Sequence, residues 1–365
     1  MDNCRLLIFP LDLDDADPVI RVAKSLGIEV IGASSAMPDS GQRGVDHFLR
    51  LPFVTDPAFD AALQEVLHRH RITAVFSPHQ GVWRHLEKLA QASPQTYGYA
   101  LCGPDPFTAT WQLFSPHESW AATVGKGMWA PTPAARPALS PASYAALHRL
   151  FISTPGQCDE GKLHALCDIA RSLPVGDLLE VGCLYGRSAI ALGFLAARHR
   201  IGSLICVDPW ETLAVTDQGA QAALLNTELK SLDSQEIFRI FISTAALVDN
   251  IGYIRHTSAA AQAIYEAAKI QGSLSSAELG SISLAPALSL LHIDGNHRYD
   301  FVKQDVAIWS PYLAEGGWLL LDDYVWAFGD GPKRVGDELL DSPCWDNAFV
   351  SGDTLFLRRT AAPLP

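Results

Sequence analysis

One stretch in the second half of the chain decides the fold: Leu178-Leu179-Glu180-Val181 followed by Gly182-Cys183-Leu184-Tyr185-Gly186. The first four residues are the apolar run of a buried strand. Gly182 and Gly186 let the backbone turn tightly and approach a ligand without Cβ clashes, although such turns also serve as plain tight connections. Arg187 and Ser188 then begin a helix with an apolar face. A strand, a turn and a helix in this order predict an α/β fold.

Further apolar runs continue this alternation of strands and helices. The next strand, 204–207, ends in Asp208, and a carboxylate at the C-terminal end of a strand suits the two hydroxyls of a ribose. The third strand and its exit are expected at 253–258, and later strands at 288–293 and 318–321. Residues 347–350 and 354–358 are candidates for a final antiparallel hairpin. We therefore predict a seven-stranded, mostly parallel sheet in the second half of the chain.

The glycine loop has the spacing G-x-x-x-G, which differs from the G-x-G-x-x-G of dinucleotide-binding proteins and speaks against a nicotinamide oxidoreductase. It resembles the first motif, E/D-x-G-x-x-x-G, of class I S-adenosylmethionine-dependent methyltransferases, and this resemblance implies their Rossmann-like fold. The resemblance also implies that S-adenosyl-L-methionine contacts Glu180, Gly182, Tyr185, Gly186, Ser188, Asp208, Thr257 and Ser258. For Thr257 and Ser258 the alternative is a hydroxyl that caps the helix beginning at Ala259.

Carboxylates follow two neighbouring strands of the predicted sheet. Asp294-Gly295-Asn296-His297 comes after the strand 288–293, and Asp322-Asp323 comes after 318–321. Three carboxylates at adjoining strand ends repel one another unless a cation or protons intervene. Oxygen ligands of this kind suit Mg²⁺ better than zinc.

The order Asp294-x-x-His297 followed by Asp322-Asp323 resembles the metal-dependent O-methyltransferases of the macrocin and mycinamicin type, and also the cephalosporin-biosynthesis methyltransferase-like proteins. The resemblance covers about residues 160–325. It implies that Asp294, Asp322 and Asp323 bind Mg²⁺ and that His297 is the general base. The sugar-modifying members of that group often have Glu-Asp where this chain has Asp322-Asp323. The alternatives are that the pair caps the next segment and that His297 is a surface loop residue.

The first half of the chain has its own rhythm of short strands and helices, so we expect a small α/β domain at residues 1–124. It resembles the domain that precedes the catalytic part of ATP-grasp ligases, and its role stays unassigned. Residues 125–142 contain Pro131, Pro133, Pro137 and Pro141 in nearly uncharged sequence, which is typical of an extended linker. The methyltransferase-like domain is then expected at 143–365.

Composition limits the partners. The 365 residues include 27 Lys and Arg and 40 Asp and Glu, which gives a net charge of −13. The sequence contains no run of basic residues that would indicate a nucleic-acid site. Apolar stretches are too short to span a membrane, the N-terminus does not read as a secretory signal, and the seven cysteines include no C-x-x-C pair. We expect a cytoplasmic protein with reduced thiols that acts on a small-molecule acceptor.

These observations together predict an Mg²⁺-dependent O-methyltransferase that acts on a hydroxyl of a sugar or secondary metabolite. One alternative is a scaffold that binds S-adenosylmethionine without catalysis, and another is a cephalosporin-hydroxylase-like relative on the same fold. The long stretch between Asp208 and the strand near 253 is expected to be a lid over donor and acceptor or, alternatively, a helical contact in a homo-oligomer.

Overall fold

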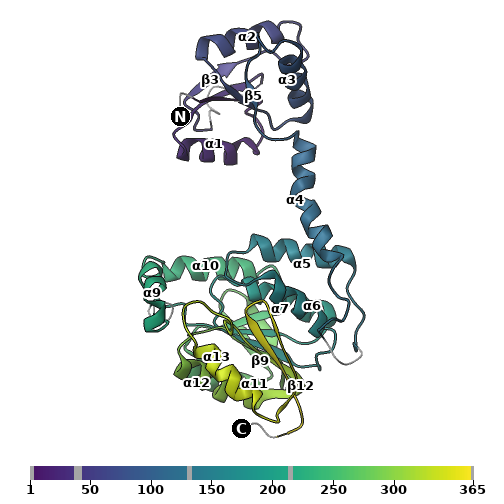
Figure 1. The fold of residues 1–365 in the computed structure, drawn as a ribbon, viewed down its shortest axis with the longest axis vertical. Coiled ribbons are helices and arrows are strands. Elements are labelled where there is room, and N and C mark those ends of the chain that lie inside the picture. Colours follow the sequence, from purple (N-terminus) through teal and green to yellow (C-terminus); the bar gives the residue numbers. More distant parts are fainter. Residues whose placement is uncertain (1–3, 37–42, 130–133, 213–216, 363–365) are drawn as a thin grey trace. The chain divides into compact units, whose positions relative to one another are not determined.

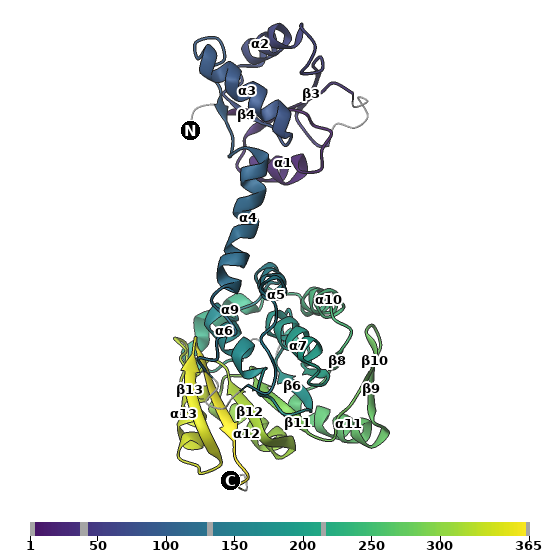
Figure 2. The ribbon, with the colours of Figure 1, turned by 90° about the vertical axis from the view of Figure 1, so that its right-hand side faces the viewer.

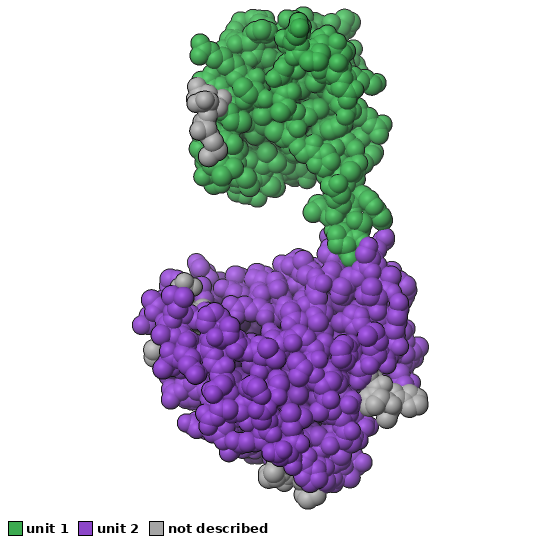
Figure 3. Space-filling view, in the orientation of Figure 1, with its two compact units in different colours: residues 1–116 green, residues 117–365 purple. Residues whose placement is uncertain are grey.

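The computed structural model describes residues 4–36, 43–129, 134–212 and 217–362. The chain divides into two compact units, residues 1–116 and residues 117–365, which Figure 3 shows in different colours. The division falls within helix α4 (Pro106–Ala121), before the segment 125–142 that we predicted as a linker. No helix among the described residues is long and apolar enough to cross a membrane.

Unit 1 is a five-stranded parallel sheet in the order β3-β2-β1-β4-β5. The strands that begin at residues 5, 29 and 74 lie at its centre, and most of their apolar side chains are almost fully buried. The elements are β1 (Arg5–Ile8), α1 (Ala16–Ser25), β2 (Glu29–Ser34), β3 (His47–Arg50), α2 (Phe59–His70), β4 (Ala74–Phe76), α3 (Gln80–Ala92) and β5 (Ala100–Leu101).

Unit 2 contains the predicted seven-stranded sheet, in the order β13-β14-β12-β11-β6-β7-β8. Strands β8, β7, β6, β11 and β12 run parallel, and β14 pairs antiparallel with both β12 and β13, as expected for the final hairpin. The strands are β6 (Asp177–Val181), β7 (Leu204–Val207), β8 (Ile251–Ile254), β11 (Leu288–Ile293), β12 (Leu313–Leu321), β13 (Trp345–Ser351) and β14 (Thr354–Arg359). A separate antiparallel hairpin, β9 (Ser273–Ser276) with β10 (Gly280–Ser283), was not predicted.

Helices cover both faces of this sheet (Figures 1 and 2). One hydrophobic core lies beneath α5 (Pro141–Ser153), α6 (Glu160–Ile169), α7 (Arg187–His199) and α10 (Ser234–Ala245). A second core lies beneath α11 (Ser258–Gln271), α12 (Tyr299–Trp309) and α13 (Gly331–Leu340). The short elements are α9 (Ala223–Leu229), η2 (Ala220–Ala222) and η3 (Ser310–Tyr312). Because helices cover both faces, the central strands are apolar along most of their length, and for this reason they could be predicted from the sequence.

The segment predicted as a linker packs on unit 2 where it is described. The backbone amides of Gly127 and Met128 donate to the carboxylate of Asp168 at 2.9 and 2.8 Å. Arg136 and Arg171 bond each other's backbone, and α5 begins at Pro141 with Ser140 as its N-cap. Pro131 and Pro133 lie outside the described residues.

Candidate active site

The predicted site residues follow the C-terminal ends of neighbouring parallel strands, so they gather at one edge of the sheet. Gly182 follows β6, Asp208 follows β7, Asp294 follows β11 and Asp322 follows β12. Ladder hydrogen bonds continue across these ends: the Asp294 amide donates to the Val181 carbonyl at 2.8 Å, and the Asp322 amide donates to Ile293 at 3.0 Å. The topology therefore brings the glycine loop and the acidic residues together.

The position of Gly182 requires a glycine, because the backbone of Asp294 lies directly against it. Its φ is +83°, a left-handed conformation that favours glycine. A Cβ at this position would lie 2.0 Å from the carbonyl oxygen of Asp294. The close approach that we predicted for a ligand is therefore made, in this structure, to the backbone that carries the acidic loop. Gly182 sets how closely the two loops pack.

Asp208 organises the glycine loop. One carboxylate oxygen accepts the backbone amides of Cys183 and Leu184 at 2.8 and 3.2 Å, and the other accepts the amide of Trp210 at 2.6 Å. Burial raises the pKa of Asp208, while these amide hydrogen bonds oppose the shift. The residue predicted to hold a ribose thus also fixes the loop beneath it, and its contact with the donor stays a prediction.

We expect Asp208→Asn to lower the free energy of unfolding by about 2 kcal/mol, because hydrogen bonds to a charged acceptor are worth about 1.5–3 kcal/mol. An amide can offer its oxygen to only one of the two sets of backbone donors, and its NH₂ group then faces the other set. Urea unfolding measures the loss. The exposed Asp300→Asn is the matched control, and equal stabilities of the two variants would contradict this role for Asp208.

A cavity of about 320 Å³ opens beside Asp208 and is lined by Pro209, Trp210, Glu211, Ser234, Gln235, Arg255, His256 and Thr257. Thr257 is the N-cap residue of α11, but its hydroxyl makes no capping hydrogen bond. Ser258 is engaged elsewhere, because its hydroxyl accepts the indole N–H of Trp309 at 2.7 Å. Of the two predicted hydroxyls, Thr257 lines the cavity and Ser258 has a structural partner. Tyr185 packs against the first core and Ser188 is buried in α7.

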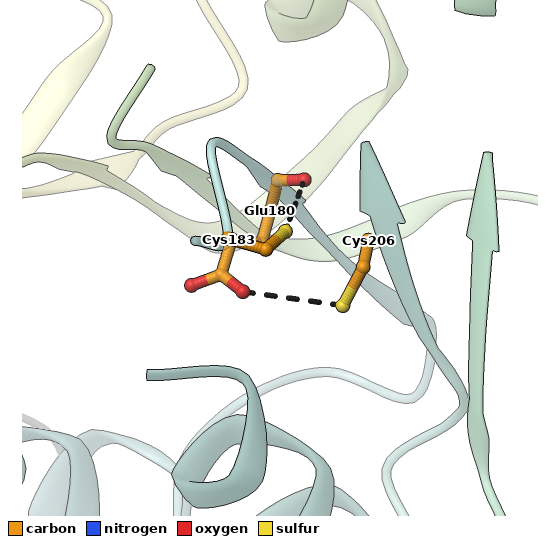
Figure 4. Close-up of side chains that lie close together, drawn as sticks. All are labelled: Glu180, Cys183 and Cys206. Atoms are coloured by element: carbon orange, nitrogen blue, oxygen red, sulfur yellow. Dashed lines mark hydrogen bonds between the residues drawn. The ribbon is translucent and has the colours of Figure 1, made fainter. Parts of the chain in front are cut away.

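Glu180, predicted to contact the donor, points into the interior. Its side chain is fully buried and accepts from Nδ1 of His292 at 2.9 Å. The thiol of Cys206 donates to its carboxylate at 3.9 Å, and the thiol of Cys183 donates to its backbone carbonyl at 3.8 Å (Figure 4). In this structure Glu180 is a partner of a buried histidine, and the predicted contact with a bound donor does not follow from its position.

Asp322 also differs from its predicted role. Lys162 of α6 has a fully buried side chain, and its ammonium forms an ion pair with Oδ2 of Asp322. Nε2 of His292 lies 3.6 Å from the same oxygen, and the hydroxyl of Thr354 donates to Oδ1. Burial by itself would raise the pKa of Asp322, but the attraction of Lys162 outweighs it and holds that pKa well below its usual range. The negative charge of Asp322 is therefore balanced by the ammonium of Lys162.

The second member of the acidic pair turns toward the predicted base. Asp323 has a left-handed φ of +53°, which sends its carboxylate away from that of Asp322. Its Oδ2 lies 3.1 Å from Nε2 of His297, and Oδ1 of Asp294 lies 3.7 Å from the same nitrogen. Neither approach has hydrogen-bond geometry, since both ring nitrogens of His297 lack a hydrogen-bond partner within the described part of the chain. The edge of the Trp326 ring packs against the imidazole.

The electrostatics of this second group differ from those of the first. Burial lowers the pKa of His297, although Asp323 acts in the opposite direction. Burial raises the pKa of Asp323 to about 6, with His297 opposing. Burial and the neighbouring Asp322 together raise the pKa of Asp294 well above its usual range. Burial thus favours the neutral form of His297, which is the state that a general base needs.

Part of the predicted lid contacts the loop that carries His297. The side-chain oxygen of Gln218 accepts the backbone amide of His297 at 2.9 Å, and Asp217 forms an ion pair with Arg298 at 2.8 Å. The side-chain amide of Asn296 also donates to the backbone carbonyl of Asp217. Residues 213–216 of this stretch lie outside the described residues. Of the two interpretations, these contacts favour the lid.

The predicted three-carboxylate magnesium site does not fit this arrangement. Asp294, His297 and Asp323 form one group of ligand atoms within 4.8 Å of one another, whereas Asp322 belongs to another group with His292 and Asp294. Both oxygens of Asp322 already have partners within the protein. The acidic pair therefore does not converge on one ion with Asp294, because the two side chains face different neighbours.

Sequence reasoning missed three residues of this edge: Lys162, His292 and Thr354. His292 stands within an apolar strand, where a titratable side chain needs a buried partner, so that position was a usable signal. Lys162 and Thr354 lie 160 and 32 residues from Asp322 along the chain. No local pattern connects such distant positions.

Comparison with known proteins agrees with the predicted class. Residues 179–324 match the family model of a methyltransferase domain, and no curated protein matches the chain. Among solved structures, the O-methyltransferase NovP is 16% identical with a TM-score of 0.39, over 55% of this chain and 80% of that one. The calicheamicin methyltransferase CalS11 is 11% identical with a TM-score of 0.41, over 70% and 93%. MycE from the mycinamycin pathway, in complex with Mg and SAH, is 14% identical with a TM-score of 0.30, over 51% and 45%.

The family match confirms two predictions. The second unit contains a class I methyltransferase domain with a Rossmann-like α/β fold, and the protein is an S-adenosylmethionine-dependent methyltransferase. The motifs that carried the predictions, the glycine loop and the two acidic strand ends, all lie inside the matched residues.

Proposed function

We propose that this protein transfers the methyl group of S-adenosyl-L-methionine to a hydroxyl oxygen of a small molecule, with His297 as the general base. The observation that carries the proposal is the group formed by His297, Asp294 and Asp323 at the sheet edge that also bears the glycine loop. A neutral imidazole whose ring nitrogens have no hydrogen-bond partner in the described chain is able to accept a proton from a bound hydroxyl. The acceptor class, a sugar or secondary metabolite, rests on the resemblance of the D-x-x-H and acidic-pair motifs.

The reaction needs one proton transfer and one displacement. His297 takes the proton of the acceptor hydroxyl, and Asp323, whose Oδ2 lies 3.1 Å from Nε2, stabilises the imidazolium that forms. The acceptor oxygen attacks the methyl carbon in line with the carbon–sulfur bond, so a carbon–oxygen bond forms while the sulfur keeps the bonding pair and leaves as a thioether. The proton then passes from His297 to solvent. Because the magnesium site does not fit as predicted, no step is assigned to a metal.

The contacts of Gln218 and Asp217 with the His297 loop suit a cover over the reacting atoms. Exclusion of water strengthens the electrostatic interactions among buried charges. The aromatic side chains of Trp326 and Phe328, which contact each other beside His297, supply an apolar wall for an acceptor. Pockets for small molecules combine such apolar walls with a few placed polar groups.

The proposal is tested by calorimetry with S-adenosylhomocysteine followed by turnover assays with a panel of sugar and polyhydroxylated aromatic acceptors. Donor-product binding together with S-adenosylhomocysteine release that depends on an acceptor hydroxyl supports it. Binding without turnover on any acceptor favours the non-catalytic scaffold. Turnover on an amine or thiol, but on no hydroxyl, contradicts the assignment of O-methylation.

We expect kcat/KM to fall only at acid pH. A base must be unprotonated, and burial places the pKa of His297 below its ordinary value of about 6.5. Activity is therefore full at neutral pH and lost as the pH falls through that lowered value. A pH–rate profile with the best acceptor measures this, and an activity that declines already between pH 7 and 8 on acidification would contradict the assignment of His297.

A further inference from the structure

The ammonium of Lys162 lies inside the acidic edge of the sheet. Its side chain is completely buried, and helix α6 holds it there because Asp159, the N-cap of that helix, accepts the backbone amide of Lys162 at 2.8 Å. The ammonium pairs with Asp322, the residue that the resemblance implies as a metal ligand. A lysine is almost never fully buried unless it has a charged partner, so this contact defines the local structure.

We propose that Lys162 is the resident cation of this edge: it takes the charge-balancing place of a divalent ion at Asp322, so that this methyltransferase needs no metal. Lys162 is then a positioning residue that fixes Asp322. The proposal concerns the same site as the proposed O-methylation and rests on it for the statement about turnover. Its central claim, the occupation of Asp322, is tested through cation binding without turnover.

The coordination of Asp322 supports the proposal. Its Oδ2 meets the Lys162 ammonium and lies 3.6 Å from Nε2 of His292, and its Oδ1 accepts the hydroxyl of Thr354. A divalent ion bound to either oxygen would have to displace one of these partners and would then lie beside an ammonium. Repulsion between two cations at such short range in a buried site is strongly unfavourable.

The buried carboxylates of this edge also have basic partners. Glu180 pairs with His292, His292 lies beside Asp322, and Asp322 pairs with Lys162. Two carboxylates thus alternate with a histidine and a lysine, and all four side chains are almost fully buried. Buried charges persist in proteins when they are paired in this way. Asp294 lies next to this network, since its carboxylate belongs to the group of ligand atoms that also contains His292 and Asp322.

The consequence for the site is a division into two layers. The inner layer, from Glu180 to Lys162, is almost fully buried and holds the strand ends in place. The outer layer, Asp294, His297 and Asp323, is more exposed, with side chains 14–26% accessible. An acceptor hydroxyl meets the outer layer, where His297 removes its proton.

The experiment is a Mn²⁺ titration of the full chain followed by electron paramagnetic resonance, with Mn²⁺ as the probe for divalent ions. We expect the wild-type protein to show no saturable site tighter than about 0.1 mM. In Lys162→Met, which keeps the side-chain length without the charge, Asp322 is freed beside Asp294, and binding should tighten at least about tenfold. Mn²⁺ should also raise the Tm of this variant and leave that of the wild type unchanged.

Two controls separate the claim from a general effect. The exposed Lys303→Met should bind Mn²⁺ as the wild type does, and Lys162→Met/Asp322→Asn should lose the gain. One saturable Mn²⁺ site in the wild type, tighter than about 0.1 mM and removed by Asp322→Asn, would overturn the proposal. The titration of the wild-type protein tests the proposal even if Lys162→Met does not fold. If no acceptor is ever methylated while these results hold, the proposed function fails and the resident cation stands.

Discussion

Replacing His297 with alanine is expected to lower kcat by about 10²–10⁴-fold, because general base catalysis contributes a factor of this size. Burial favours the uncharged imidazole of His297, because it lowers the pKa of that ring. The measurement is the rate of S-adenosylhomocysteine formation at saturating donor with an acceptor found in the panel. The dissociation constant of the donor product should stay the same.

The matched control is His68→Ala, which removes an exposed histidine of unit 1. It should keep the wild-type kcat. A His297→Ala variant that turns over at the wild-type rate would remove the base from the mechanism and would leave only a packing role against Trp326. If the variant loses only donor binding, His297 contacts the donor and is not the base that acts on the acceptor.

Glu180→Ala is expected to lower the free energy of unfolding by about 3–5 kcal/mol. Removal of one partner from a buried ion pair leaves the other charge uncompensated, and this is the usual size of the loss. The residue left behind is His292, whose side chain is 1% accessible and whose second nitrogen lies 3.6 Å from Asp322. Urea unfolding followed by circular dichroism measures the change. The exposed Glu315→Ala is the control and should cost less than about 0.5 kcal/mol.

The pH dependence of this stability identifies the pair. Burial tends to lower the pKa of His292, but the neighbouring carboxylates of Asp322 and Glu180 raise it to about 9. The ordinary value is about 6.5, so the stabilisation is complete below pH 6.5 and is lost as the pH rises through 9. The wild type should lose stability over this interval, and Glu180→Ala should lose less. Equal pH slopes in the two proteins would contradict the buried pair.

The sheet of unit 2 could be predicted because its central strands are buried on both faces. The runs at 178–181, 204–207, 288–293 and 318–321 are apolar at almost every position, and they coincide with β6, β7, β11 and the end of β12. The hairpin of β9 and β10 was not predicted, since its strands consist mostly of serine and glycine with one buried apolar side chain each, Leu274 and Ile282. Short strands of this composition have no clear period.

The sequence by itself determined the order of elements and the edge at which the chemistry gathers, because parallel strands deliver the residues after their C-terminal ends to one place. It could not decide which way adjacent side chains face. Asp322 and Asp323 are neighbours in sequence, yet the left-handed backbone at Asp323 turns one carboxylate to His297, while the other meets Lys162. Only the tertiary structure decided this, since a buried carboxylate takes its charge partner from whichever helix packs above it, and that helix lies 160 residues away along the chain.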